Sequence, residues 1–439
     1  MSESDVERRA FLKTAAGVGA AALSGAPAIL AQRGANDRIG VAVVGVGTRG
    51  HFLLDWVQEA PNTEIRVICD LYDGNIQRAQ KQAFNKKAAV IKEWEKAVAS
   101  PDVDVVIIAA PDFWHAPMAI RAAENKKHIY VEKGLCRTIE EAKGIRKAVR
   151  DNGVTLQLGH HQNSEAAFVK AREIFRSGKL GKVTLARTYI DRTNPWPEWQ
   201  FYTDYNIQQI PPGASASTID WNRFVANAPS HAFDAERFFR WRCWWDYGTG
   251  IAGDLMSHQW DGVNLIAGMG IPESVQTQGG LYFWKQDREV PDMWHVLFDY
   301  PKKEMAVTFA CSFHNRHHGT NTYIFGRDAT IEVASEWCRV YEAEWKPESQ
   351  EKQSKARRAA AAAGKDPGLA VVEADYAWKK GDGEVSNHMR NFIDSVRGLD
   401  TPRCGMDRAF EEAATIVMSV DSYFKERKVK WDPVSETVI

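Results

Sequence analysis

Cysteine is scarce and scattered in this chain of 439 residues. Its six cysteines include no C-x-x-C pair, so neither a zinc knuckle nor a dense disulfide framework is indicated. Cys69 and Cys311 fall within strand-like apolar runs, and we expect buried thiols there rather than bridges. The hydrophobic content of 44% and the charged content of 26% are ordinary for a globular protein, and the length predicts more than one domain.

An excess of charge is also lacking. The 56 lysines and arginines nearly balance the 57 aspartates and glutamates, which leaves a formal net charge of -1. This balance gives no electrostatic case for binding nucleic acid or anionic lipid. Beyond residue 31, no run reaches the roughly 18 apolar residues of a membrane-spanning helix. We therefore expect a soluble mature chain with no stable membrane insertion.

The start of the chain carries two adjacent arginines in "RRAFLK" at residues 8–13, and an apolar Gly/Ala-rich run follows at 15–31. This segment resembles a twin-arginine signal, whose core is RRxFLK, although Glu7 stands where Ser or Thr is usual. The resemblance implies a signal peptide over 1–31, recognition by the twin-arginine export machinery and a periplasmic location. The alternative interpretations are a disordered terminus or a signal anchor.

A glycine-rich turn follows the first strong apolar run, residues 39–44, and precedes a helix-like stretch. The turn contains Gly45, Gly47, Thr48, Arg49 and Gly50 in a GxGxxG pattern. Where side chains are missing, the backbone can approach a pyrophosphate, and the N-terminus of the helix supplies N–H groups and a positive dipole. The sequence therefore predicts a dinucleotide-binding turn here.

Asp70 ends the next expected strand, "EIRVICD", twenty residues beyond Gly50. A carboxylate at this place can accept both ribose hydroxyls of NAD, and it would repel the 2′-phosphate of NADP. We therefore predict NAD as the cofactor, with NADP as the alternative. The competing interpretation is an aspartate that merely ends a strand.

Strand-like and helix-like runs alternate as far as residue 161, with further strands expected at 103–112, 128–134 and 154–161. Such alternation predicts an α/β fold, namely a Rossmann domain with a doubly wound parallel sheet over residues 36–160. Ligands of these sheets bind at the carboxyl ends of the strands. The residues that fall at these ends are Gly45, Asp70, Pro111, Lys133 and His160.

The segments "AAPDFWHAPMAI" and "HIYVEKGL" resemble the glucose–fructose oxidoreductase, inositol dehydrogenase and rhizopine-catabolism (Gfo/Idh/MocA) family. The family pattern here is (T/A)PDxWH followed by EKP, and this chain has Gly134 in place of the proline. The resemblance covers nearly the whole mature chain. On this basis the expected cofactor-binding residues also include Pro111, His115, Glu132 and Lys133.

Residues 161–385 are expected to form an α+β domain that binds substrate and carries a large, open, mostly antiparallel sheet. Alternating runs occur at 184–192, 274–284, 293–300, 304–313 and 321–333. The family's second domain is of this kind and often builds homo-oligomers with the free face of its sheet. A charged, Ala-rich stretch at 344–368 is expected to be a surface insertion, and 386–439 to form C-terminal helices and a tail that pack back on both domains.

The segment "GDLMSHQWD" places Asp254, His258 and Asp261 at i, i+4 and i+7, which share one face of a helix. Oxidising a carbinol requires a base, histidine has a suitable pKa, and a nearby carboxylate can orient its ring. The family uses the lysine of EKP and a DxxxH pair, which implies that Lys133, Asp254 and His258 are catalytic here. The competing interpretation is a helix N-cap at Asp254 and a packed core histidine at His258.

Aromatic and basic residues precede this helix in "RWRCWWDYGTG". They suit the C–H faces and hydroxyls of a sugar, although aromatic core packing explains them equally well. The expected substrate-binding residues are His161, Arg242, Trp245, Asp254 and His258. "FHNRHHG" holds three histidines, but adjacent histidines alternate faces on a strand, and we predict no metal site.

These patterns together predict an exported NAD(P)-dependent oxidoreductase that acts on a hydroxyl of a sugar, polyol or glycoside and holds its cofactor tightly. A second hypothesis is an NAD-dependent glycoside-cleaving enzyme, in which transient oxidation of a ring hydroxyl permits elimination. A third is a non-catalytic sugar-binding protein that keeps the cofactor as part of its structure. The expected partners are a small carbohydrate or polyol and further copies of the chain.

Overall fold

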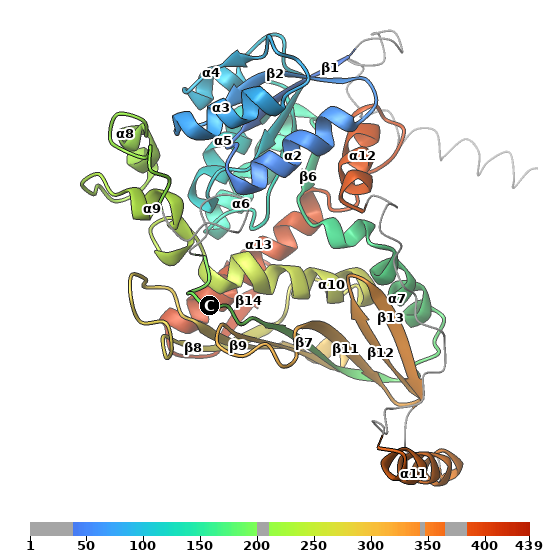
Figure 1. The fold of residues 1–439 in the computed structure, drawn as a ribbon. Coiled ribbons are helices and arrows are strands. Elements are labelled where there is room, and N and C mark those ends of the chain that lie inside the picture. Colours follow the sequence, from blue (N-terminus) through green and yellow to red (C-terminus); the bar gives the residue numbers. More distant parts are fainter. Residues whose placement is uncertain (1–37, 200–209, 343–346, 365–383) are drawn as a thin grey trace, which may run out of the picture.

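The computed structural model describes residues 38–199, 210–342, 347–364 and 384–439 (Figure 1). The expected signal peptide, residues 1–31, lies outside the described residues. In the part of the chain that is described, no helix is both long and apolar enough to span a bilayer. All six cysteines are buried free thiols, as expected for Cys69 and Cys311.

The first domain is built on a six-stranded parallel sheet with the strand order β3-β2-β1-β4-β5-β6. Its strands are β1 (Ile39–Val44), β2 (Thr63–Cys69), β3 (Ala89–Val90), β4 (Val105–Ile108), β5 (His128–Val131) and β6 (Leu156–Leu158). Every residue of β1, β4 and β5 is buried, because helices cover both faces of the sheet. The predicted doubly wound sheet is confirmed, and the two-residue β3 is an addition to it.

The helices of this domain connect the strands in the expected alternation. They are α2 (Thr48–Glu59), α3 (Asp73–Gln82), α4 (Trp94–Val98), α5 (Asp112–Glu124) and α6 (Ile139–Asn152). Helix α6 begins with a capping box between Thr138 and Glu141 and ends at Gly153, whose φ of 62° is left-handed. Because β1 lies between β2 and β4, the chain changes direction there, and the carboxyl ends of these strands form the crevice in which such sheets bind ligands.

The second domain contains a nine-stranded sheet with the order β13-β12-β11-β7-β10-β9-β8-β14-β15. Its strands are β7 (Val183–Asp191), β8 (Ser274–Gly280), β9 (Met293–Tyr300), β10 (Met305–Ser312), β11 (Thr320–Gly326), β12 (Ala329–Ala334), β13 (Trp337–Glu342), β14 (Val429–Asp432) and β15 (Thr437–Val438). Only β7 and β10 pair in parallel, so the expected mostly antiparallel sheet is confirmed.

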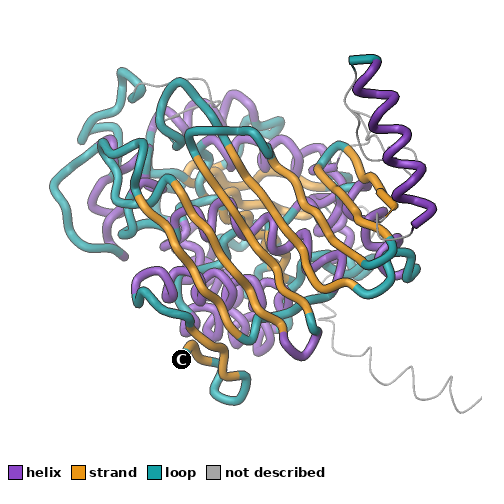
Figure 2. The backbone as a smooth tube through the Cα atoms, turned by 90° about the horizontal axis from the view of Figure 1, so that it is seen from below, coloured by secondary structure: helices purple, strands orange, loops and turns teal. Residues whose placement is uncertain are grey.

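One face of this sheet is covered and the other is open, as Figure 2 shows from below. Alternate residues of β10 are buried, as a strand with one packed face requires. Helices α7 (Ala166–Arg176), α10 (Ser257–Ala267) and α13 (Met406–Phe424) pack against the covered face. Helix α11 (Pro347–Ala362) lies within the expected insertion, and its described side chains are mostly exposed.

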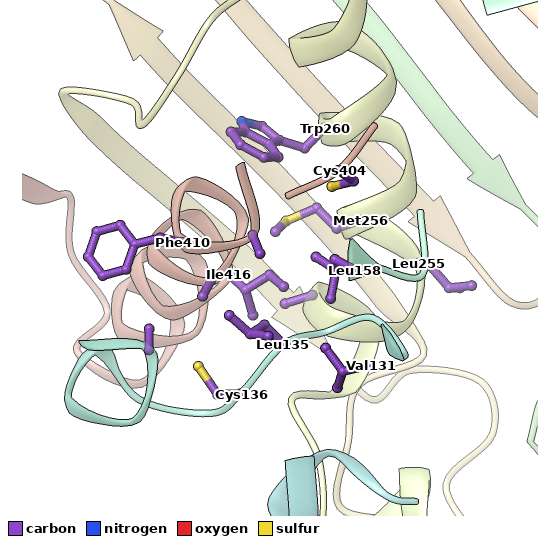
Figure 3. Packing of buried hydrophobic residues seen from close by; sticks show 14 of the residues in the cluster. Val131, Leu135, Cys136, Leu158, Leu255, Met256, Trp260, Cys404, Phe410 and Ile416 are labelled. Atoms are coloured by element: carbon purple, nitrogen blue, oxygen red, sulfur yellow. The ribbon is translucent and has the colours of Figure 1, made fainter. Parts of the chain in front are cut away.

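The C-terminal helices join the two domains. Helix α12 (Glu384–Val396) packs Met389, Phe392 and Ile393 into the core beneath α2, whereas α13 contacts both α6 and β8. In Figure 3, Leu135 of the first domain, Met256 of the second and Ile416 of α13 meet in one apolar cluster. The contact between the domains is therefore part of the hydrophobic core, which fixes how the domains face one another.

Candidate active site

A cavity of about 350 Å³ lies between the carboxyl ends of the first sheet and the start of helix α10. It is lined by residues of both domains, so it exists only where the domains meet. The sequence-predicted residues that line it are Gly45, Gly47, Thr48, Arg49, Asp70, Pro111, Glu132, Lys133, His161, Arg242, Asp254 and His258. The structure thus brings most of the expected cofactor, substrate and catalytic residues together.

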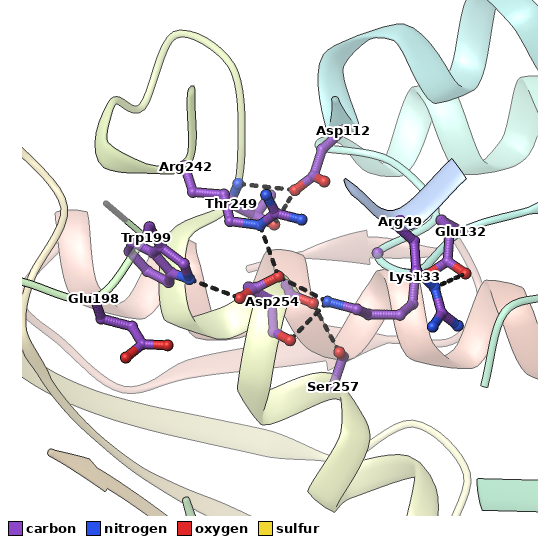
Figure 4. A network of polar contacts seen from close by, with 12 residues as sticks. Arg49, Asp112, Glu132, Lys133, Glu198, Trp199, Arg242, Thr249, Asp254 and Ser257 are labelled. Atoms are coloured by element: carbon purple, nitrogen blue, oxygen red, sulfur yellow. Dashed lines mark hydrogen bonds and ion pairs between the residues drawn. The ribbon is translucent and has the colours of Figure 1, made fainter. Parts of the chain in front are cut away.

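Lys133 and Asp254 form an ion pair across the two domains (Figure 4). The Lys133 ammonium donates to Asp254 Oδ1 at 2.8 Å and to the backbone carbonyl of Asp254 at 2.7 Å. Lys133 follows β5, whereas Asp254 lies in a π-helical turn, Ala252–Met256, that leads into α10. Both side chains are largely buried but border the cavity, so the ammonium can reach a ligand oxygen there.

Asp254 accepts two further hydrogen bonds, which exhaust much of its capacity. Arg242 Nε donates to Oδ1 at 3.0 Å, and the indole N–H of Trp199 donates to Oδ2 at 2.8 Å. Burial pushes the pKa of Asp254 upward, but the charges of Lys133 and Arg242 outweigh this effect and hold the pKa well below its usual range. The carboxylate therefore stays ionised and keeps the lysine in place.

The backbone at Gly134, next to Lys133, lies close to the backbone at Gly253, next to Asp254. The peptide bond between Lys133 and Gly134 is cis. A Cβ at Gly134 would lie 3.1 Å from Ile416 Cδ1 and 3.5 Å from the Cα of Gly253, next to Asp254. The absence of a side chain at Gly134 therefore suits the tight packing of the lysine loop against α13 and the π-helical turn.

His258 borders the same cavity one helical turn after Asp254. Its ring lies edge-on to His160 and to His161, with centroid separations of 5.6 Å in both cases. Burial, aided by the charge of Lys133, lowers the pKa of His258 well below 6.5. The imidazole is therefore neutral near pH 7 and can accept a proton from a bound hydroxyl.

The expected face of three residues holds for only two of them. Asp254 and His258 line the cavity, but Asp261 is 1% exposed and binds Arg408 and Asn163 instead. Asp261 Oδ2 lies 4.0 Å from His160, whose ring contacts His258, so Asp261 stands behind the residues that border the cavity. The competing interpretation of Asp254 as a helix N-cap does not hold, because Asp254 lies inside the π-helical turn and pairs with Lys133.

The buried imidazole of His160 packs against His258 on the side away from the cavity. His160 lies within 2.7 Å of Glu412 Oε1 and 4.0 Å of Asp261 Oδ2, and none of the three side chains is more than 2% exposed. Burial alone would lower the pKa of His160, but the two carboxylates raise it above its ordinary value. His161 next to it has a pKa lowered well below 6.5 by burial and by Arg49. The pKa values of the two neighbouring histidines therefore shift in opposite directions, and His161 lines the cavity as a neutral ring.

The other end of the cavity fits a dinucleotide. Gly45 has a φ of +82°, and a Cβ at Gly50 would lie 1.8 Å from the carbonyl oxygen of Gly45, so both positions need glycine. A Cβ at Gly47 would meet only Asn75 Nδ2, at 3.7 Å, which leaves room beside the loop. No side chain caps the N-terminus of α2, and the positive end of the helix dipole lies at this loop, which favours a phosphate there.

Asp70 is positioned by backbone groups at the end of β2. Its carboxylate accepts from the N–H of Val46 at 2.8 Å and from that of Tyr72 at 2.9 Å. Asn75 Nδ2 lies 3.3 Å from both carboxylate oxygens, so ribose hydroxyls bound at Asp70 would take the place of these long contacts. Burial raises the pKa of Asp70, and the hydrogen bonds from Tyr72, Val46 and Asn75 oppose this shift.

Arg49 of the glycine loop is held toward the sheet. Its Nε donates to Glu132 Oε1 at 2.7 Å (Figure 4), and its guanidinium lies 4.9 Å from the centre of the Trp56 ring. Glu132 precedes Lys133, so the glycine loop and the lysine loop are tied together. This contact explains how the two expected cofactor residues share one wall of the cavity.

Three of the expected site residues do not line the cavity. Trp245 packs against Trp294, Tyr423 and Phe424, so its predicted contact with substrate is corrected to aromatic core packing. The ring of His115 is 1% exposed and bridges the carbonyls of Gly134 and Ala110, each at 2.8 Å. Gly50 serves the close approach of α2 to the loop. The latter two support the site rather than face a ligand.

Several lining residues were missed by sequence reasoning. They are Asn75, Lys92, Trp94, Asp112, Trp114, Met118, Arg192, Arg223, Phe224, Phe238, Phe239, Trp241 and Leu255. The aromatic richness of residues 233–245 was a usable signal, and Trp241 stands in the cluster that it marked. Nothing local marked Lys92, which follows β3 of the first domain, or Arg192 and Arg223, which reach the cavity only through the packing of the two domains.

The histidine-rich end of β10 does not resemble a metal centre. His318 stacks on Tyr189 with ring centroids 4.5 Å apart, and its Nδ1 lies 3.1 Å from Asp191 Oδ2. Across the described ranges, no group of three or more His, Cys, Asp or Glu residues is arranged to hold a metal ion.

Comparisons with known proteins agree with this architecture. The scyllo-inositol 2-dehydrogenase (NAD(+)) of Bacillus subtilis (strain 168) is 26% identical over 232 residues, which cover 49% of this chain and 65% of that protein. The 2,7-anhydro-N-acetylneuraminate hydratase of Escherichia coli (strain K12) is 30% identical over 162 residues, or 37% and 41% of the two chains. These matches thus span less than two thirds of either relative.

Among solved structures, levoglucosan dehydrogenase in complex with NADH and levoglucosan superimposes with a TM-score of 0.64 at 18% identity, over 90% of this chain and 99% of that one. This likeness concerns the fold. Residues 39–160 match the family profile described as "Oxidoreductase family, NAD-binding Rossmann fold", and residues 216–431 match that of its C-terminal alpha/beta domain. The chain belongs to the Gfo/Idh/MocA oxidoreductase family.

Proposed function

We propose that this protein is an exported NAD(P)-dependent oxidoreductase that transfers hydride between a tightly held nicotinamide cofactor and a hydroxyl of a sugar, polyol or glycoside. The observation that carries the proposal is the single cavity with two different ends. The glycine loop and Asp70 line one end, and the Lys133–Asp254 pair and His258 line the other. A cofactor bound along the first end would present its reactive ring to the second.

The residues at the second end have complementary roles. A bound nicotinamide supplies the hydride acceptor. The Lys133 ammonium can donate to the reacting oxygen and stabilise negative charge on it. His258, neutral because its pKa is depressed, can take the hydroxyl proton. Asp254 holds Lys133 in position through the 2.8 Å contact and takes no proton itself, because its own pKa is held low.

The walls around this end suit a carbohydrate. Trp241 offers an aromatic face for C–H groups, and Arg242 lies 4.2 Å from the centre of the Trp241 ring while also donating to Asp254. The names of the two curated relatives, an inositol dehydrogenase and a hydratase of an anhydro-sugar, point to the same class of small hydroxylated molecules.

The charges near Asp70 support NAD over NADP. Lys92 and Arg223 also line the cavity, and both are paired with carboxylates: Lys92 with Asp73, and Arg223 with Asp220 at 3.0 Å. A 2′-phosphate would therefore meet the Asp70 carboxylate together with cations that already have partners. Release of NADP from the purified protein would contradict this preference.

A redox-neutral reaction is the second candidate function. The E. coli relative is named a hydratase, and a hydration involves no net oxidation. In the glycoside-cleaving version, oxidation of a ring hydroxyl acidifies the adjacent C–H bond, elimination follows, and the hydride returns. An assay with added NAD separates the two, since only the net dehydrogenase accumulates NADH. A purely sugar-binding protein would reduce no cofactor with any carbohydrate.

Oligomer formation through the open sheet face is part of this proposal. Leu297 on β9 is 44% exposed, and the partly exposed Tyr189, Tyr323 and Phe325 lie on the same sheet. A second copy of the chain could cover these apolar side chains. The open face is broad, and it lies away from the cavity, so pairing would leave the site accessible.

Export explains the tight hold on the cofactor. The space beyond the inner membrane has no maintained pool of NAD, so an enzyme that works there must be loaded beforehand. The twin-arginine route carries folded proteins, and the arginines at residues 8 and 9 fit that route. We therefore propose a mature periplasmic protein that begins near Gln32 with nucleotide already bound.

Replacing Lys133 with Ala should abolish turnover and leave the nucleotide bound, because the lysine acts on the substrate oxygen whereas the glycine loop and Asp70 hold the cofactor. Turnover and the nucleotide released on denaturation are measured on the same preparation. Lys182→Ala, which alters an exposed lysine paired with Glu304, is the matched control and should behave as the unmodified protein. Near-normal turnover of Lys133→Ala would refute the assignment.

The rate should remain insensitive to acid down to a pH below 6.5. His258 must be neutral to accept a proton, and its depressed pKa keeps it neutral until the pH falls through that value. The acid limb of the kcat/KM profile reports this group. His258→Gln should lower kcat/KM by about 10²–10⁴-fold and remove the limb. An acid limb at or above pH 6.5 in the unmodified protein would argue against His258 as the base.

Changing Arg8 and Arg9 together to Lys should leave folded precursor in the cytoplasm with its nucleotide bound. The twin-arginine machinery requires the arginine pair, whereas folding around the cofactor does not. Cell fractionation, followed by nucleotide analysis of each fraction, checks both statements. Normal export of the double variant, or a periplasmic protein that contains no nucleotide, would contradict the proposal.

A further inference from the structure

A segment of the second domain crosses to the first domain and runs beside the cofactor end of the cavity. We call residues 210–247 the strap. It contains the short helices α8 (Trp221–Phe224) and α9 (Ala235–Phe239), which lie beside the first domain in Figure 1, away from the nine-stranded sheet. The Rossmann profile ends at residue 160, so the strap belongs to neither the dinucleotide-binding motif nor its connecting helices.

The strap is attached directly after Asp70. The N–H of Asp220 donates to the carbonyl of Leu71 at 2.9 Å, and the N–H of Asp73 donates to the carbonyl of Thr218 at 3.0 Å. These two bonds form an antiparallel bridge between Tyr72 and Ile219. The strap is thus paired with the backbone two residues after Asp70, the expected ribose-binding carboxylate.

Buried side-chain contacts fix the strap at further points. The indole N–H of Trp114 donates to the carbonyl of Phe224 at 3.1 Å, and Asn227 Nδ2 donates to the carbonyl of Phe113 at 2.8 Å. Phe224 is 2% exposed and packs edge-on against Phe113. Because the Trp114 indole and Phe224 are shielded from water, separating the strap from the first domain would break a buried hydrogen bond and expose aromatic surface together.

The strap faces the same cavity as Asp70 from the opposite side. At the cofactor end, the strap contributes Arg223, Phe224, Phe238 and Phe239 to the lining, and the first domain contributes Asp70, Leu71, Asn75, Lys92 and Trp94. The ring of Tyr72, next to this wall, lies edge-on to Phe239 with a centroid separation of 5.2 Å. A ribose held by Asp70 would therefore have strap residues, rather than open solvent, on its far side.

We propose that the strap is the second wall of the adenosine subsite, with Phe238, Phe239 and Arg223 in contact with the bound dinucleotide, and that it slows dinucleotide release. This inference rests on the proposed dinucleotide site. Aromatic side chains bind the π-face of any base, which suits a wall that must hold an adenine without reading its edges. The strap also couples retention to the second domain, because the nucleotide can leave only when this wall moves.

The test measures dissociation of NADH from the full-length protein in three variants. Phe239→Ala removes a lining ring, and Arg223→Gln removes a lining cation. Phe233→Ala is the matched control, because Phe233 belongs to the strap and packs edge-on to Trp221 but does not line the cavity. Each protein is saturated with NADH, excess NAD is added, and the loss of bound NADH fluorescence gives the dissociation rate constant.

We expect Phe239→Ala to raise the dissociation rate constant about tenfold, as the loss of one base–aromatic contact does. Arg223→Gln should raise it as well, and Phe233→Ala should match the unmodified protein. Thermal unfolding of the nucleotide-free proteins checks that all three fold alike. If Phe239→Ala does not fold, the comparison of Arg223→Gln with Phe233→Ala decides.

Two failures can be told apart. If the unmodified protein binds neither NADH nor NAD, the proposed function is wrong and the inference about the strap falls with it. If the unmodified protein retains NADH and the lining variants release it no faster than Phe233→Ala does, only the strap inference is overturned. A rise confined to the two lining variants supports it.

Discussion

The ion pair between Lys133 and Asp254 is the constraint on which the rest of the site depends. It joins a loop of the first domain to a helical turn of the second, with a separation of 2.8 Å and little solvent around either group. A charge left without its partner in such a place is costly, so the pair reinforces the position that the apolar contact between the domains sets. The cavity, its two ends and the access of His258 to a ligand all follow from that position.

Two features of the structure maintain this geometry. The apolar contact around α13 sets the distance between the domains, with Leu135, Met256 and Ile416 packed in one cluster. Around Asp254, the indole of Trp199 and the guanidinium of Arg242 supply additional donors. The apolar cluster fixes the distance between the domains by packing, and the two donors fix the Asp254 carboxylate by hydrogen bonds. The carboxylate therefore has a fixed direction as well as a fixed ionisation state.

The sequence predicted those parts of the molecule that depend on local chemistry. The apolar runs specify parallel strands. Gly45 is required by its left-handed φ, and Gly50 by its close contact with the backbone of Gly45. The glycine loop and Asp70 could therefore be found without a structure. Lys133 and His258 were identified through a resemblance to family motifs. Their shared cavity is a consequence of domain packing that no local pattern contains.

The errors have physical reasons too. Trp245 carries the same composition signal as Trp241, but only packing decides which ring faces the cavity and which enters the core. The strap was not recognised from the sequence, because its aromatic residues share a cavity wall only after the strap has packed against the first domain.

The most direct test of the central claim is a double-mutant cycle on the ion pair, with Lys133→Met, Asp254→Asn and the double variant. Reduction of the bound cofactor is followed at 340 nm in a single turnover, with a sugar or polyol that reduces the unmodified protein. If the two residues act as a unit, the double variant should be no slower than the slower single variant. If the losses multiply instead, Lys133 and Asp254 act independently, and the ion pair is not the basis of the site.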